Sequence, residues 1–175
     1  MILIYIILFI LAVYFIFFFF QFINIVFKGY APFISTNRKI FKALIRDIEI
    51  KEDFKVYELG CGRAGFLRII ENAYPKTQLI GLENLLSVYF INKIKFKLLG
   101  SRIKLFKKDF FSVDLKEADL IYCYLNNATM KRLGEKFRNE CKAGTQVISQ
   151  SFSIPQFIPK KVMRIANKNI YFYKI

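Results

Sequence analysis

A glycine-rich turn directly after an apolar stretch constrains the fold of this chain more than any other feature. Apolar and aromatic residues dominate positions 54–59, and the chain then passes straight into Gly60-Cys61-Gly62-Arg63-Ala64-Gly65. This order predicts a buried strand, a turn whose backbone N–H groups approach a ligand closely, and a helix. Glu58, two places before the first glycine, suits a ligand with an ammonium group better than a pyrophosphate. The turn therefore indicates S-adenosylmethionine rather than NAD.

The rest of the chain alternates between strand and helix patterns. Further strands are expected at 78–83, 102–107, 119–124 and 145–151, with helices at 64–73, 86–98 and 130–141. An earlier helix, capped by Ser35 or Thr36, presents apolar residues at helical spacing from Ile40 to Ile48. Two short runs, 161–166 and 170–174, form a hairpin around a turn at 167–169. We expect an α/β fold, a Rossmann-like, mostly parallel seven-stranded sheet that ends in an antiparallel hairpin.

The amino-terminal stretch predicts a transmembrane helix. Every residue from Ile2 to Phe20 is apolar or aromatic, and only Gln21 and Asn24 interrupt the run before Phe27. Roughly 20 such residues cross a hydrocarbon layer of about 30 Å. A cleaved signal peptide would need a basic start and small residues at its cleavage site, and a buried core helix would need a larger domain. We expect an anchor at 1–27 and a single domain at 28–175.

The distribution of charge suggests how the chain is oriented in a membrane, but it excludes few classes of binding partner. Basic residues follow the apolar run at Lys28, Arg38, Lys39, Lys42 and Arg46, which predicts a domain facing the cytoplasm. The chain has 28 basic and 13 acidic residues, a formal net charge of +15. That excess favours anionic partners, although a solvated lysine-rich surface explains it equally well.

Histidine is absent from the chain, and three cysteines, Cys61, Cys123 and Cys141, lack the close spacing of zinc ligands. No metal site is therefore predicted, and histidine-based acid–base chemistry is excluded. Cys61 and Cys123 fit small buried positions better than reactive ones.

The glycine turn and two later acidic residues resemble the motifs of class I S-adenosylmethionine-dependent methyltransferases. In that family an acidic residue such as Glu58 helps to hold the cofactor's amino group, one such as Glu83 binds the ribose hydroxyls, and one such as Asp109 binds adenine beside an aromatic ring. An NAD site also uses an acid near Glu83, but it explains neither Glu58 nor the terminal hairpin. The resemblance implies a set of cofactor-binding residues: Glu58, Gly60, Cys61, Gly62, Gly65, Glu83, Asn84, Asp109 and Phe110.

A narrower resemblance covers nearly the whole predicted domain. The chain is similar to small membrane-anchored protein-lysine methyltransferases, the family of the mitochondrial ATP synthase c-subunit lysine methyltransferase. The shared parts are a hydrophobic amino-terminal segment, a stretch like 32–36, the Glu83-Asn84 pair and a stretch like 152–155. Departures occur at Leu85, at Phe110-Phe111 and in the loop 124–127, so the substrate is the least constrained part. The resemblance implies a lid or substrate-contacting segment that includes Tyr30, Phe33 and Thr36.

The chemistry of methyl transfer adds two candidate catalytic residues. An in-line displacement gains mostly from positioning, and a lysine acceptor must first lose its proton. Without histidine, Tyr124, Asn126 or a water molecule is expected to orient the amine, with Tyr124 the first candidate, although Tyr124 also suits a packed strand end.

These observations predict a membrane-anchored S-adenosylmethionine-dependent methyltransferase that acts on a lysine of a membrane-associated protein. Methylation of a lipid or small hydrophobic molecule is an alternative, as is a non-catalytic membrane scaffold with the same fold. RNA is disfavoured as a partner because the basic residues are spread widely and an RNA enzyme would not need an anchor.

Overall fold

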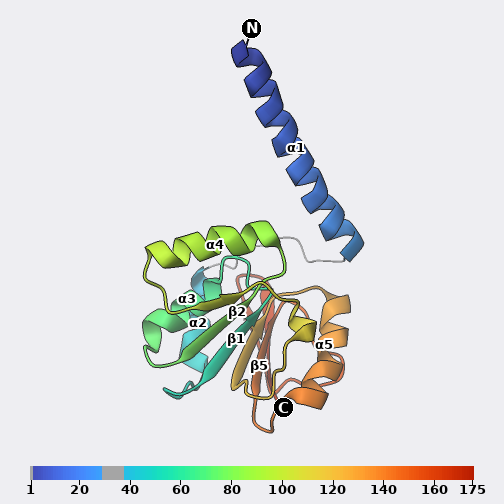
Figure 1. The fold of residues 1–175 in the computed structure, drawn as a ribbon. Coiled ribbons are helices and arrows are strands. Elements are labelled where there is room, and N and C mark those ends of the chain that lie inside the picture. The colour runs from blue at the N-terminus through green and yellow to red at the C-terminus, as the bar shows by residue number, and fades with distance from the viewer. Residues whose placement is uncertain (1, 29–37) are drawn as a thin grey trace. The chain divides into compact units, whose positions relative to one another are not determined.

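A computed structural model describes residues 2–28 and 38–175 in two separate units (Figure 1). The first contains helix α1, Ile2–Lys28. Its stretch Ile2–Phe20 has a mean hydropathy of 3.1 and exposed apolar side chains. By length and composition it is able to cross a membrane, a property that cleaved signal sequences share.

The second unit is built on a seven-stranded sheet with the order β3-β2-β1-β4-β5-β7-β6. Neighbouring strands from β3 to β5 pair in parallel, whereas β7 pairs antiparallel with both β5 and β6. This confirms the predicted sheet and its terminal hairpin. The strands are β1 Lys55–Leu59, β2 Gln78–Leu82, β3 Lys104–Phe106, β4 Leu120–Cys123, β5 Gln146–Gln150, β6 Lys161–Ile165 and β7 Lys168–Lys174.

Helices cover both faces of the sheet. Successive residues of each strand point to opposite faces, so each strand contributes side chains to two apolar clusters. On β1, Val56 joins the apolar cluster that contains α2 and α3, whereas Tyr57 joins the cluster that contains α5. The helices of this unit are α2 Arg38–Asp47, α3 Gly65–Ala73, α4 Leu86–Leu98 and α5 Asn127–Glu140, with a short 3₁₀ turn, η1, at Phe110–Ser112.

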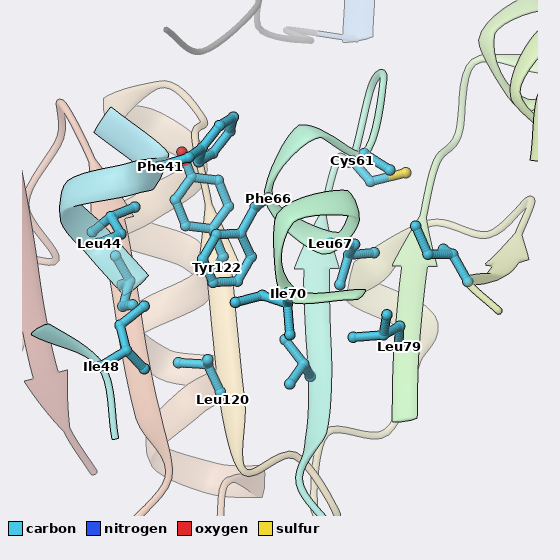
Figure 2. Packing of buried hydrophobic residues seen from close by; sticks show 14 of the residues in the cluster. Phe41, Leu44, Ile48, Cys61, Phe66, Leu67, Ile70, Leu79, Leu120 and Tyr122 are labelled. Carbon is cyan, nitrogen blue, oxygen red and sulfur yellow. The ribbon is translucent and has the colours of Figure 1, made fainter. Parts of the chain in front are cut away.

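An aromatic group fixes the helices of the first face to the middle of the sheet (Figure 2). Tyr122 of β4 stacks on Phe66 of α3 with their ring centroids 4.4 Å apart, and Phe41 of α2 packs against both rings. All three residues are buried. This packing holds α3, and with it the glycine turn before α3, in a fixed position on the sheet.

Several predicted boundaries differ from the structure by one to three residues, and two of these differences have a clear local cause. The final strand β7 starts at Lys168 rather than 170, because the turn consists of Ala166 and Asn167 alone, with φ of 49° and 60°. Positive φ at both positions gives the tight turn that matches the twist of paired strands. Helix α5 starts at Asn127 rather than 130, because the Asn126 side chain caps it.

Candidate cofactor and acceptor site

The parallel strands of the sheet end level with one another. Leu59 of β1 pairs with Leu82 of β2 and with Cys123 of β4, and Leu82 pairs with Phe106 of β3. Residues that follow these four ends therefore share one edge of the sheet, where α/β folds place their ligands. The site residues predicted after the strands lie along this edge.

The glycine turn needs its glycines for different reasons. Gly60 and Gly62 have φ of 64° and 51°, a left-handed backbone that side chains disfavour. A Cβ atom on Gly60 would also lie 2.9 Å from Cδ2 of Leu125. Gly65 has no positive φ, but a Cβ there would lie 2.9 Å from the Phe41 ring. Gly60 and Gly62 thus shape the turn, and Gly65 allows α2 to approach α3.

Glu58 supports the start of α3. Its carboxylate accepts hydrogen bonds from the backbone N–H of Leu67, at 3.1 Å, and from the backbone of Phe66. Ala64, before this helix, provides no side-chain cap, so Glu58 satisfies N–H groups that would otherwise be buried and unpaired. Burial raises the pKa of Glu58 to about 8 despite these bonds. The buried acid therefore favours a cationic ligand, which would stabilise its ionised form.

Glu83 ties the turn to the next helix. One carboxylate oxygen accepts the N–H of Gly62 at 2.9 Å and the other accepts that of Leu85 at 2.8 Å. Burial raises its pKa, while the backbone donors of Leu85, Gly62 and Asn84 oppose that shift. Each carboxylate oxygen has more than one lone pair, so these bonds leave capacity to accept ligand hydroxyls. Asn84, next along the chain, is half-buried.

Asp109 and Phe110 lie after β3 in different environments. Asp109 is exposed, and its Oδ1 accepts the N–H of Phe111 at 2.9 Å, which starts η1. Phe110 is buried in the core beneath the turn, with its Cε1 3.9 Å from the place of a Cβ on Gly60. Phe111 is less buried and has the Arg132 guanidinium 4.0 Å from its ring centre. The aromatic residue beside Asp109 that is more open to a ligand is thus Phe111.

Cys61 is a buried packing residue of the turn, as its sequence context predicts. Its N–H donates to the carbonyl of Leu82 at 3.0 Å, and its sulfur lies 3.1 Å from the place of a Cβ on Gly81. Burial raises the pKa of its thiol, so the sulfur stays protonated and poorly nucleophilic.

The two candidate catalytic residues have separate partners. Tyr124, half-buried after β4, accepts a hydrogen bond at its hydroxyl from the Lys168 ammonium, whose Nζ lies 4.7 Å from the ring centre. Asn126 accepts the N–H of Thr129 at 2.9 Å through its side-chain oxygen. Tyr124 therefore contacts a cation, whereas Asn126 fixes the start of α5. The predicted lid residues Tyr30, Phe33 and Thr36 lie outside the described residues.

Three residues at this edge were not predicted from the sequence. Asn92 of α4 is buried and donates its side-chain N–H to the carbonyl of Gly62. Lys168 belongs to the terminal hairpin and contacts Tyr124 44 positions away. Gln150, at the end of β5, accepts from the Tyr122 hydroxyl at 2.5 Å, and its buried Nε2 has no hydrogen-bond partner within the described residues. Among these three, Asn92 alone has a sequence signal, because it is a polar residue at helical spacing from Phe96 on the buried side of α4.

The geometry fits S-adenosylmethionine at three points. Gly60 and Gly62 have a left-handed backbone and carry no side chain that would keep a ligand away from their main chain. Glu83 presents a buried carboxylate suited to a pair of hydroxyls, and Glu58 one suited to an ammonium. The candidate residues for cofactor and acceptor thus lie on neighbouring strand ends.

Comparisons with known proteins agree with this geometry. Residues 58–161 match the model of the ANTKMT methyltransferase domain. A protein-lysine N-methyltransferase of Saccharolobus islandicus is 27% identical over 153 residues, covering 83% of this chain and 94% of that protein.

Solved structures share the fold at lower sequence identity. An RNA methyltransferase from Salinibacter ruber, in complex with S-adenosyl-L-homocysteine, superposes with a TM-score of 0.75 at 18% identity, covering 81% of this chain and 94% of that one. A precorrin-6y C5,15-methyltransferase from Geobacter metallireducens superposes with a TM-score of 0.68 at 11% identity, covering 83% and 92%. The chain belongs to the ANTKMT methyltransferase domain family and is a class I methyltransferase that uses S-adenosylmethionine.

Proposed function

We propose that this methyltransferase transfers methyl groups to a lysine side chain of a membrane-associated protein. The observation that carries lysine as the acceptor is the contact between Tyr124 and the Lys168 ammonium. An aromatic face attracts a cation, and the phenol oxygen accepts its hydrogen bond. The same group suits the amine of an incoming lysine when Lys168 moves aside. The Saccharolobus islandicus relative, a protein-lysine N-methyltransferase, supports this acceptor class.

Each end of the cofactor has a proposed partner. The backbone of Gly60 and Gly62 lies against its middle, Glu58 attracts its ammonium, and Glu83 accepts from both ribose hydroxyls. Asp109 accepts from the adenine amino group at the far end of the edge. The buried positions of Glu58 and Glu83 support these roles, because hydrogen bonds to a charged acceptor are strongest away from water.

The protein's part in the reaction is to favour the neutral form of the acceptor amine and to position its nitrogen. S-adenosylmethionine, when bound, would supply an electrophilic methyl carbon: the amine nitrogen bonds to that carbon as its bond to sulfur breaks, and the sulfur leaves as a neutral thioether. A free lysine has a pKa of about 10.4, and both desolvation and a nearby positive charge lower it. The Tyr124 hydroxyl then accepts from the neutral amine and fixes its lone pair, while the proton leaves to water. Positioning of this kind is able to provide most of the acceleration.

The amino-terminal helix supplies the location in this proposal. Residues 1–27 anchor the chain, and residues 28–175 form the catalytic domain on the cytoplasmic side. The apolar stretch Ile2–Phe20 and the basic residues after it support that arrangement. Tethering to a bilayer raises the effective concentration of a membrane-bound acceptor without any new contact.

Incubation of the full chain with methyl-labelled cofactor and native membranes tests the proposal. We expect label in protein, and mass spectrometry should locate it on lysine. A Glu83→Ala variant serves as the control for cofactor-dependent transfer. Label in lipid with none in protein would replace the lysine acceptor with a lipid, and binding without any transfer would favour a scaffold.

A further inference from the structure

The outward face of α4 is apolar to an unusual degree. Side chains on this helix and in its final turn are exposed by half or more: Leu86 by 51%, Phe90 by 50%, Ile91 by 66%, Ile94 by 62%, Leu98 by 81% and Leu99 by 59%. Other large apolar side chains exposed within residues 38–175 occur singly, as at Ile158. A contiguous apolar surface of this kind marks an interaction site.

Helical spacing gathers these residues into one stripe. Leu86, Phe90, Ile94 and Leu98 recur every four positions, so they lie along one side of α4. The opposite side is buried through Asn92 and Phe96, and Asn92 donates to Gly62 in the glycine turn. The apolar stripe therefore faces away from the glycine turn, while the opposite side of α4 contacts that turn. In Figure 1, α4 crosses the direction of β1 and β2.

Positive charge borders the stripe. Residues 84–108 contain no acidic residue but seven basic ones, Lys93, Lys95, Lys97, Arg102, Lys104, Lys107 and Lys108. On α4, Lys93 and Lys97 flank the stripe on one side and Lys95 on the other. Partial burial, together with the charges of Arg68 and Arg63, lowers the pKa of Lys95. The partner of this face should thus be apolar in its interior and anionic at its surface.

We propose that α4 rests on the surface of an anionic lipid bilayer, with its apolar stripe among the acyl chains and its lysines at the headgroups. Helices with this distribution lie in the plane of the interface. A second copy of the chain would set the same positive charge against itself, and helix α1 would cover the stripe without matching the lysines. Docking here would bring the glycine turn to the membrane side of the domain, where an acceptor lysine near the interface is within reach.

This inference rests on the proposed anchor, which would keep the domain close to a bilayer. Nine residues, 29–37, separate α1 from α2 in the sequence. A chain of that length reaches at most about 30 Å. An anchored α1 would therefore hold α4 at a high effective concentration beside the lipid surface, where even modest affinity keeps it docked.

A single introduced tryptophan tests the contact, because the chain has none of its own. Full-length Ile94→Trp protein is reconstituted into vesicles of equal parts phosphatidylcholine and phosphatidylglycerol with brominated acyl chains. Insertion of roughly 5–10 Å places the indole near the bromines, so we expect a blue shift and roughly twofold quenching. Ile158→Trp, at an even more exposed site away from α4, should show neither effect.

Charge reversal separates docking from anchoring. Lys93→Glu with Lys97→Glu, in the Ile94→Trp background, should abolish the quenching while the protein still floats with the vesicles. Lys51→Glu with Lys160→Glu makes the same charge change at exposed lysines outside α4 and should leave quenching intact. Floating Ile94→Trp protein whose introduced indole stays unquenched would overturn the inference, whether or not another protein surface shields it. Failure to float would overturn the anchor as well.

Discussion

The two halves of the sheet's carboxyl edge hold their polar groups in different ways. Beside β1 and β2, Glu58 and Glu83 are buried and accept backbone N–H groups, so their positions follow from the path of the chain. Beside β4 and β7, Tyr124 and Lys168 are half-buried and contact each other through side chains alone. A backbone-fixed region stays in place, whereas a pair of side chains can separate. That difference suits a donor that needs one geometry and an acceptor that must enter and leave.

Loss of Glu83 should have the largest effect on the fixed half. Glu83→Ala removes the acceptor for Gly62 and Leu85 as well as for the proposed ribose hydroxyls. We expect the Kd of S-adenosylmethionine to rise about 100-fold, equivalent to about 3 kcal/mol. Calorimetry on the full chain measures it, with the exposed Glu117→Ala as the control. Unchanged affinity would mean that the ribose is bound elsewhere.

Truncation of Tyr124 should instead affect the movable half. Tyr124→Ala removes both the ring and the hydroxyl that would receive the acceptor amine, so we expect turnover to fall by roughly 10- to 100-fold, comparable to the loss of one positioned catalytic group. Cofactor affinity should stay within about twofold, because the residues proposed to bind the cofactor most tightly follow β1 and β2 and accept hydrogen bonds from backbone groups, not from Tyr124. Tyr124→Phe separates the hydroxyl from the ring. A parallel loss of cofactor binding would show that the two halves are not independent.

The raised pKa of Glu58 predicts a pH dependence of cofactor binding. With a pKa of about 8 the free protein holds Glu58 mostly neutral at pH 7, and a bound ammonium requires it ionised. Affinity should therefore rise about eightfold from roughly pH 6.5 to 7.5, with release of a proton. Calorimetry in buffers of different ionisation enthalpy detects that proton. Glu58→Gln should remove the pH dependence, and a flat profile in the unaltered protein would limit Glu58 to supporting α3.

The same pKa gives a stability prediction of opposite sign for the free protein. The unfolded carboxyl ionises near 4.5, whereas the folded one stays protonated until about 8. Glu58 should therefore make the fold less stable as pH rises through that window. Urea unfolding across it measures the trend, which should be weaker in Glu58→Gln.

Removal of Lys168 should have the smallest effect. Lys168→Met keeps the length of the side chain but leaves the Tyr124 ring and hydroxyl open to the acceptor. We expect KM for the acceptor to fall by about threefold, because an exposed cation–π contact is worth about 0.5–1 kcal/mol. Lys160→Met, at an exposed position, is the matched control. A rise in KM would mean that Lys168 helps to build the acceptor site instead of competing for it.

The contrast between the halves also explains what the sequence could predict. Glu58, Gly60, Gly62 and Glu83 lie at strand ends, where a local pattern determines position. Lys168 reaches Tyr124 only because β7 pairs with β5 in one register and already starts at Lys168, directly after a two-residue turn that was predicted from the sequence at 167–169. The acceptor-orienting role of Asn126 stays a prediction. Its capping bond to α5 was not predicted, because that bond depends on where the helix starts.

The level strand ends imply that donor and acceptor specificity can be changed separately. The residues directly after β3, β2, β1 and β4 are Lys107, Glu83, Gly60 and Tyr124. Strands lie about 4.8 Å apart, so this row is about 14 Å long, comparable to an extended nucleoside joined to an amino acid. In the proposed function, each residue of this row faces a different chemical part of the methyl donor or the acceptor. Exchange of residues after β4 should therefore change which acceptor the enzyme uses. The residues after β3, β2 and β1 should continue to bind the same methyl donor.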